Sequence, residues 1–217
     1  MSTNPFITPF DSLPSTLPIF PLPGAIVMPG AELPLNIFEP RYLNMINDAI
    51  ASHRMIGMVQ PDPNGEGEDG ICRTGCAGRI TQFRETNDCR IEMVLTGVCR
   101  FDVVEELPTT RGYRLIVPDW SRFADDYVDH ADLVQGDHER LMQTLERFFD
   151  LKGYEADLAM LKQLSVARLV DSLTMALPFD AAEKQMLLET VEPEQRLTNF
   201  IALIDGEFDV PDSVTRH

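Results

Sequence analysis

The hydrophobic period of this chain changes once, and that change limits the possible folds more than any other feature of the sequence. Across residues 17–118, apolar residues alternate with polar ones or form short runs punctuated by Gly and Pro, a pattern typical of β-strands. Beyond residues 119–136, apolar residues recur at helical spacing instead. This order predicts an α+β protein in which a small β-rich, barrel-like domain precedes three or four helices.

Shifts in composition divide the chain further. The first 16 residues are rich in Pro, Ser and Thr and have no periodicity, so we expect a loose leader. The acidic stretch that carries the single tryptophan is expected to be a solvated junction. The expected segments are a flexible leader at 1–16, a β-rich subdomain at 17–118, an acidic junction at 119–136, a helical subdomain at 137–210 and a tail at 211–217.

Several local signals predict where elements begin and end. Pro40 suits the first turn of a helix that should end near His53, and Gly97 interrupts an alternating run in the manner of a β-bulge. In the helical part, Pro178 stops one long helix and Pro193 opens another. That long helix is expected to present Leu158, Leu161, Leu169 and Leu173, and the helix after it to begin with a capping box of Asp180 and Glu183.

The charge of the chain limits its partners. With 35 acidic and 18 basic residues, the formal net charge is -17. Such a field repels phosphate backbones and anionic lipid surfaces, so we expect no nucleic-acid partner and no membrane partner. The N-terminus lacks the pattern of a signal peptide and no apolar run is long enough to span a bilayer. We therefore expect a cytoplasmic protein with reduced cysteines.

One dense run of motifs carries a family resemblance. The segment LPIFPLPGAIVMPGAELPLNIFEPRY, at residues 17–42, resembles the opening of the N-terminal substrate-binding domain of the ATP-dependent Lon protease. A second match runs from Gly75–Ile80 to the Gly97–Phe101 segment, which is similar to the G-x-x-R-F element of that family. A weaker third match lies at residues 183–189 and Arg196-Leu197.

The resemblance implies a fold and a function. It implies a PUA-like β pseudo-barrel followed by a C-terminal helical bundle, used in Lon to engage unfolded or damaged polypeptide. The sequence ends at His217 without a glycine-rich phosphate loop or a Ser-Lys peptidase domain. We therefore expect a non-catalytic protein without a cofactor, possessing neither ATPase nor peptidase activity.

Other chemistry is less well supported by spacing. Cys72, Cys76, Cys89 and Cys99 lack the paired C-x₂-C signature of zinc sites, and Cys99 should lie in the core. Residues 61–70 lack the ligand register of a calcium loop, and the carboxylates near His130 are expected to be a solvated linker. Lys162 and Ser165 are close enough on one helix to touch, but an exposed helix face supplies no oxyanion hole. We expect no metal site and no catalytic residue.

The family resemblance and an expected surface position suggest four polypeptide-binding residues: Ile37, Phe38, Arg41 and Tyr42. The predicted function is recognition of unfolded or hydrophobic polypeptide segments, as a substrate adaptor or quality-control module, with a separate protease as a candidate partner. For each of the apolar residues taken singly, core packing is the favoured interpretation. The alternative functions are a small hydrolase or peptidase with an unrecognised site, a PUA-like RNA-binding protein, and a subunit whose helices mediate assembly.

Overall fold

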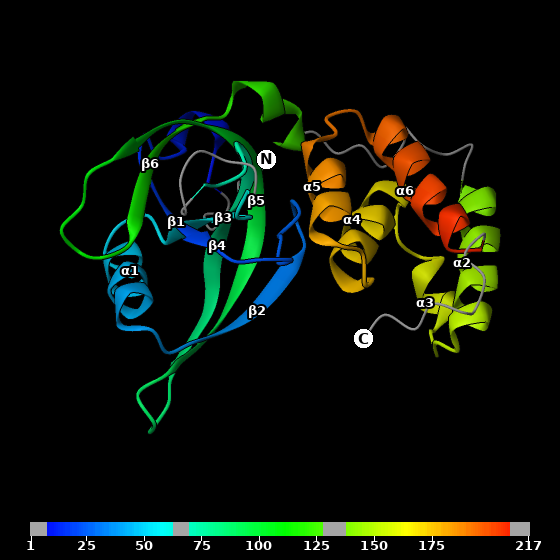
Figure 1. Ribbon diagram of the computed structural model, residues 1–217, viewed down its shortest axis with the longest axis horizontal. Coiled ribbons are helices and arrows are strands. Elements are labelled where there is room, and N and C mark those ends of the chain that lie inside the picture. Colours follow the sequence, from blue (N-terminus) through cyan, green and yellow to red (C-terminus); the bar gives the residue numbers. More distant parts are fainter. Residues whose placement is uncertain (1–7, 63–69, 128–137, 209–217) are drawn as a thin grey trace, which may run out of the picture. The chain divides into compact units, whose positions relative to one another are not determined.

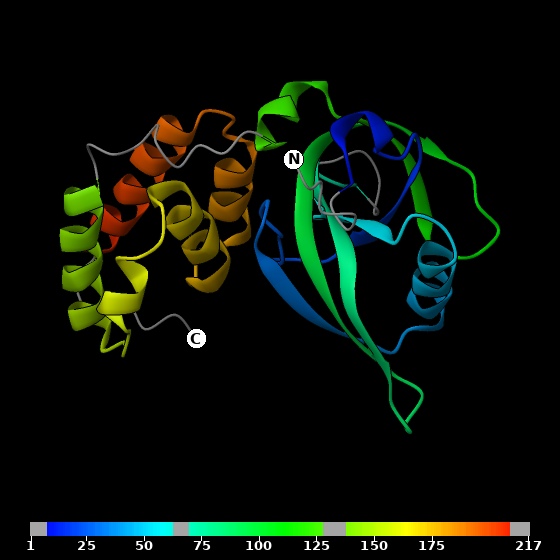
Figure 2. The same ribbon diagram turned by 180° about the vertical axis from the view of Figure 1, so that it is seen from behind.

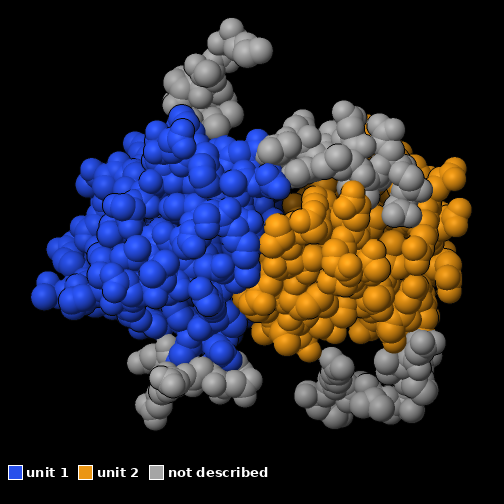
Figure 3. Space-filling model, turned by 90° about the horizontal axis from the view of Figure 1, so that it is seen from above, with its two compact units in different colours: residues 1–128 blue, residues 129–217 orange. Residues whose placement is uncertain are grey.

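The computed structural model describes residues 8–62, 70–127 and 138–208. The chain forms two compact units, residues 1–128 and 129–217, which are described separately below (Figure 3). The first contains a β-sheet and the second is helical (Figures 1 and 2). The α+β class predicted from the change of period is confirmed.

In the described part of the first unit, six strands are paired into one mixed sheet. The strand order is β2-β5-β4-β3-β1-β6, and β6 also pairs with β5, so that five of the strands form a closed ring of pairings. Only β1 and β3 are parallel; the other pairs are antiparallel. The strands are β1 (Leu17–Pro21), β2 (Glu32–Ile37), β3 (Met55–Val59), β4 (Thr74–Glu85), β5 (Ile91–Leu107) and β6 (Arg114–Asp119).

The bulge predicted at Gly97 is confirmed, and it has a packing reason. The register passes from the pair of Ala77 and Cys99 directly to the pair of Gly78 and Gly97, which leaves one extra residue on β5. Gly97 donates its N–H to the Ala31 carbonyl at 2.9 Å, and its own carbonyl accepts from Gly30 at 2.9 Å. A Cβ at Gly97 would lie 2.0 Å from the carbonyl oxygen of Met28. Only glycine allows the 28–31 loop to approach this closely.

Helix α1 (Pro40–Ile50) forms as the sequence predicts, with Pro at its first turn, although it ends before His53. Its buried residues are Tyr42, Met45, Ile46 and Ala49, at the spacing of one helix face. The helix contacts β1 and β3, and the rings of Phe20 and Tyr42 lie 4.2 Å apart. This packing fixes the position of the helix N-terminus, where the motif residues lie.

The expected leader is wrong for its described part, residues 8–16. A short 3₁₀ helix, η1 (Phe10–Ser12), precedes a buried Pro14. The indole Nε1 of Trp120 donates to the Pro14 carbonyl at 3.2 Å, and Arg79 donates to the Thr8 hydroxyl at 3.4 Å. Composition missed this because single long-range bonds to Pro14 and Thr8 leave no periodicity in the sequence.

The expected solvated junction is also wrong where it is described. Residues Ser121–Tyr127 form a second 3₁₀ segment, η2, whose Phe123 is completely buried. Asp126 forms an ion pair with Arg100 at 2.6 Å, and the two side chains are only 4% and 3% exposed. The guanidinium of Arg100 also lies 4.5 Å from the centre of the Phe123 ring. An acidic stretch thus forms part of the β unit because one carboxylate neutralises a buried arginine.

Within residues 138–208, the second unit contains five α-helices, whereas the sequence predicted three or four. Their inward faces share one apolar core, which includes Leu145, Phe148, Leu169 and Phe200. None of the helices in the described part of the chain is long and apolar enough to cross a membrane. The helices are α2 (His138–Lys152), α3 (Leu158–Leu161), α4 (Val166–Ala176), α5 (Ala181–Glu189) and α6 (Pro193–Phe208).

The extra helix arises because the predicted long helix is interrupted. Asp157 caps α3 through its carboxylate, and the Ser165 hydroxyl accepts from the Arg168 N–H to cap α4. Apolar spacing continues across the interruption, so periodicity alone missed it. The capping box of Asp180 and Glu183 is confirmed, as is the start of α6 at Pro193.

Candidate functional site

The segment between β2 and α1 carries the four residues predicted to bind polypeptide. Phe38 is 60% exposed and the side chain of Arg41 is 54% exposed, as the surface placement required. Ile37 and Tyr42 are only 3% and 5% exposed, so the expected surface placement is wrong for them. Ile37 pairs with Ile91 in the sheet, and Tyr42 packs on Phe20, so both belong to the core.

Phe38 is the most exposed aromatic side chain among the described large apolar residues. The guanidinium of Arg90, which directly precedes β5, lies 5.5 Å from the centre of the Phe38 ring. Because an exposed cation–π contact contributes little, the ring remains available for another apolar group. Phe38 is therefore an accessible anchor beside the first turn of α1.

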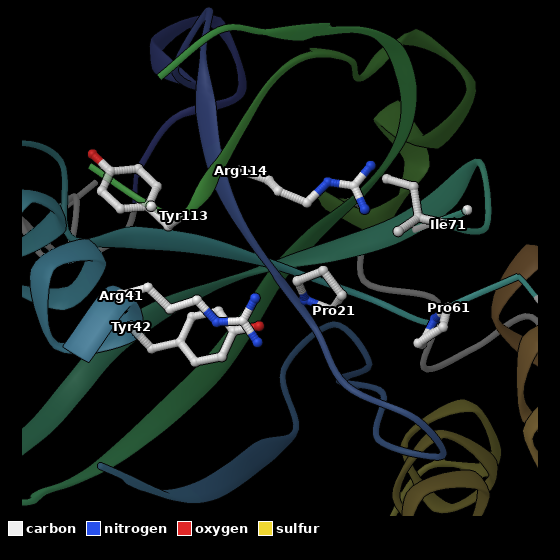
Figure 4. A pocket seen from close by; sticks show the side chains of 9 residues that line it. Pro21, Arg41, Tyr42, Pro61, Ile71, Tyr113 and Arg114 are labelled. Atoms are coloured by element: carbon white, nitrogen blue, oxygen red, sulfur yellow. The ribbon is translucent and has the colours of Figure 1, made fainter. Parts of the chain in front are cut away.

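Arg41 and Tyr42 also line a pocket in the first unit, with a cavity volume of about 180 Å³. Figure 4 shows Arg41 and Tyr42 together, with the Arg114 guanidinium directed toward Ile71. The walls thus come from the N-terminus of α1, the end of β1, the chain before β4 and the start of β6. The lining residues are Pro21, Arg41, Tyr42, Pro61, Gly70, Ile71, Gly112, Tyr113 and Arg114.

Both pocket arginines have a glutamate beside them. Arg41 donates its Nε–H to Glu39 at 2.9 Å, and its guanidinium lies 4.5 Å from the centre of the Tyr42 ring. Arg114 binds both carboxylate oxygens of Glu106 on the neighbouring strand. Burial raises the pKa of the Tyr42 phenol, although the positive charges of Arg41 and Arg114 oppose that rise. Tyr42 is thus a neutral hydrogen-bonding group in the pocket at neutral pH.

A small polar network supports the far wall of the pocket. The hydroxyl of Tyr113 donates to Asp48 of α1 at 2.9 Å, so its ring forms the wall while its polar end is engaged. Arg111 donates to both oxygens of the same carboxylate, at 2.9 and 2.8 Å. These contacts tie the turn before β6 to α1, and Arg114 and Arg41 line the same cavity.

The cysteines form no ligand set in this structure. Cys76 and Cys99 are buried, and burial raises the pKa of both thiols well above the usual range. Cys72 is half-buried and Cys89 is exposed in the hairpin between β4 and β5. Within residues 8–62, 70–127 and 138–208, no three His, Cys, Asp or Glu side chains gather as metal ligands would. The core position predicted for Cys99 is confirmed.

The proposed contact of Lys162 and Ser165 on one helix is wrong. Lys162 ends α3 and pairs with Glu146 at 3.3 Å, whereas Ser165 caps α4 with its hydroxyl. Most of the acidic loop at 61–70, and His130 with its neighbouring aspartates, lie outside the described residues.

Comparison with known proteins identifies the class of fold. The structure matches the crystal structure of the Lon N-terminal domain protein from Xanthomonas campestris with a TM-score of 0.65 and 26% identity, covering 86% of this chain and 97% of that one. It also matches the N-terminal domain of the Mycobacterium avium complex Lon protease, with a TM-score of 0.63 and 19% identity, covering 92% and 100% of the two chains. The fold is that of a Lon N-terminal domain.

The family follows from the sequence. The model of the ATP-dependent protease La (LON) substrate-binding domain matches residues 16–206, and the chain belongs to this family. The Lon protease of Dictyoglomus thermophilum is 23% identical over 92% of this chain, but the match covers 25% of that protein. The Lon protease of Anaeromyxobacter dehalogenans is 24% identical over 92%, and the match covers 24% of it. The chain thus spans about a quarter of these relatives, and the domain it matches is a substrate-binding one.

Sequence reasoning missed most of the pocket. Pro21, Pro61, Ile71 and Arg114 lie far apart in the chain, and only the closed strand ring brings them to Arg41. The alternation of side chains along β6 predicts that Arg114 and Ile116 share one face of the strand, but which cavity that face lines depends on the register. No local signal in the sequence specifies that closure.

Proposed function

We propose that this protein recognises unfolded or hydrophobic segments of other polypeptides without cleaving them. The observation that carries this proposal is the match of the Lon substrate-binding domain model to residues 16–206. A binding role of this kind needs exposed apolar anchors and moderate affinity rather than a catalytic constellation. In a cell, such a protein would act as a substrate adaptor or quality-control module, with a separate protease as its partner.

The surface around the N-terminus of α1 is the proposed contact region. Phe38 offers an aromatic anchor that is 60% exposed, and the nearby Arg41 is a wall of the pocket. Ile37 and Tyr42 contribute from beneath: they hold the segment in place by packing into the core. An apolar anchor next to a pocket with a few polar groups is typical of sites that bind extended peptides.

Three further parts of the proposal concern the fold, the partner and the location of the protein. The closed strand ring is consistent with a PUA-like pseudo-barrel. The net charge of -17 favours a polypeptide partner over a nucleic acid or an anionic membrane. A polyanion gains affinity when basic side chains release its counterions, whereas an acidic protein would keep those counterions bound. A cytoplasmic location completes the proposal.

Fluorescence anisotropy of a labelled, permanently unfolded polypeptide, titrated with this protein, tests the proposal. Cysteines of the probe should be blocked with iodoacetamide, which adds no charge. We expect saturable binding of a probe that remains intact on a gel. Fragments on the gel would instead reveal a peptidase, and tight, salt-sensitive binding of RNA in the same assay would favour the nucleic-acid alternative.

Two phenylalanine variants locate the contact. Phe38→Ala should weaken binding by about fivefold to tenfold, since one buried aromatic contact contributes about 1 kcal/mol or more. Phe83→Ala removes a ring of similar exposure, 41%, from β4 and serves as the control. Equal loss of binding in both variants would contradict the assignment of the contact to the α1 region.

A further inference from the structure

The charge of the pocket differs from that of the chain. The sequence has 35 acidic residues against 18 basic ones, yet the described residues that line the pocket include two arginines and no aspartate or glutamate. Its remaining walls are Pro21, Pro61 and Ile71, with the tyrosine rings. A cavity lined by arginines and apolar side chains favours a ligand that combines one negative charge with an apolar group, provided that this ligand shares the two guanidinium groups with Glu39 and Glu106.

The ion pair of Arg41 leaves hydrogen-bond donors for a ligand. A guanidinium carries five N–H donors, and within the described part of the chain Arg41 donates its Nε–H to Glu39 and no other N–H to a side chain or carbonyl. Both side chains of this pair are about half exposed, at 54% and 46%. Because such a pair contributes little to stability, a ligand carboxylate can share or replace Glu39 at small cost.

Arg114 is the more buried of the two arginines. Its side chain is 26% exposed, and Glu106 holds it from the adjacent strand. A carboxylate beside a partly desolvated guanidinium interacts more strongly than one in bulk water. We therefore expect the guanidinium of Arg114 to stay paired with Glu106 when a ligand binds, whereas the guanidinium of Arg41 can exchange Glu39 for the ligand carboxylate.

The apolar walls decide which carboxylate fits. An aspartate or glutamate side chain carries its charge without an apolar group of its own, whereas a C-terminal residue carries its carboxylate one carbon from its side chain. A cavity of about 180 Å³ is smaller than the roughly 300–1,000 Å³ typical of sites for drug-sized ligands, and so suits a single residue.

We propose that this pocket binds the C-terminal residue of a polypeptide when that residue is apolar, with Arg41 and Arg114 holding its carboxylate and Ile71 and the prolines contacting its side chain. This inference rests on the proposed function and specifies which segments the protein prefers. C-termini are commonly exposed even in folded proteins, so the site adds a positional signal to a sequence-tolerant surface.

Three labelled peptides of one sequence test the proposal by anisotropy. The first ends in leucine with a free carboxylate, the second ends in the corresponding amide, and the third is that amide with an aspartate inside the sequence. We expect the first to bind about tenfold more tightly than the second, the effect of one charge-assisted hydrogen-bonded contact. The affinity of the first peptide should also fall as the salt concentration is raised.

Arginine variants connect the effect to the pocket. Arg41→Gln and Arg114→Gln should each abolish most of the preference for the free carboxylate. Arg84 on β4 forms an exposed ion pair with Glu92 on β5 and does not belong to the described pocket lining. Arg84→Gln makes the same charge change there and should leave the preference for the free carboxylate unchanged. Arg41 is exposed, so its variant should keep the melting temperature even if Arg114→Gln does not.

The outcomes separate this proposal from the proposed function. Equal binding of the acid and the amide would overturn C-terminal recognition while leaving polypeptide binding intact. Equal binding of the first and third peptides would also overturn it, since an acidic side chain would then suffice. If no peptide binds while the unfolded polypeptide does, the pocket is not the C-terminal site; if neither binds, the proposed function fails as well.

Discussion

Replacement of Asp126 by alanine should destabilise the β unit by about 3–5 kcal/mol, the cost of leaving a buried charge without its partner. Asp126 accepts the backbone N–H of Arg100 at 2.8 Å, and its two oxygens accept from the guanidinium at 2.6 to 3.1 Å. The Arg100 side chain is only 3% exposed, so water cannot replace this carboxylate without opening η2.

Tryptophan fluorescence during urea unfolding provides the assay. Trp120 is the single tryptophan, and its ring centre lies 5.6 Å from that of the buried Phe101, so its emission reports on the β unit. Asp11→Ala removes an exposed carboxylate from the same unit and should change the free energy of unfolding by less than about 0.5 kcal/mol.

The double variant Arg100→Met, Asp126→Leu separates charge from packing. Because it removes both charges of this pair, it should recover much of the stability lost in Asp126→Ala. A cost below about 1 kcal/mol for Asp126→Ala would refute the reasoning, since a surface pair costs that little. A double variant as unstable as the single one would show that shape, rather than the unpaired charge, sets the cost.

Three further predictions follow from local geometry. Gly97→Ala should lower the free energy of unfolding, measured from the Trp120 transition in urea, by about 2 kcal/mol or more, because its Cβ would overlap a loop carbonyl; an unchanged free energy of unfolding would contradict the close approach. In mass-spectrometric alkylation of the native protein, Cys89 should react rapidly, while Cys99 should react only on unfolding, because it is buried and burial raises its thiol pKa; equal rates would contradict this. Burial lowers the pKa of His53, so the unfolded chain binds a proton more readily than the native state does. The free energy of unfolding should therefore fall as the pH drops below about 6.5. His53→Gln should flatten this pH dependence, and an unchanged slope in the variant would contradict the assignment to His53.

The sequence specified much of the fold because several signals agree locally. The bulge at Gly97, the helix after Pro40 and the capping box at Asp180 each follow from one residue's backbone or hydrogen-bonding preference. The family motifs also gain physical reasons. In the Gly97–Phe101 segment, glycine admits a loop, Arg100 pairs with Asp126 and Phe101 fills the core.

Long-range pairing explains what the sequence did not predict. The residues before Leu17 and the η2 segment looked polar and aperiodic, but Pro14 accepts a bond from Trp120 and Asp126 pairs with a buried arginine. Neither partner can be identified without the register of the sheet. The same limitation applies to Tyr42, whose aromatic ring suited a surface site equally well but packs on Phe20.

The most direct test of polypeptide recognition compares two forms of one labelled protein, native and permanently unfolded, in the same anisotropy titration. The account predicts saturable binding of the unfolded form, at least about tenfold tighter than binding of the native form, because only the unfolded chain exposes apolar segments for Phe38. Equal affinity for the two forms, or no binding of either, would contradict it.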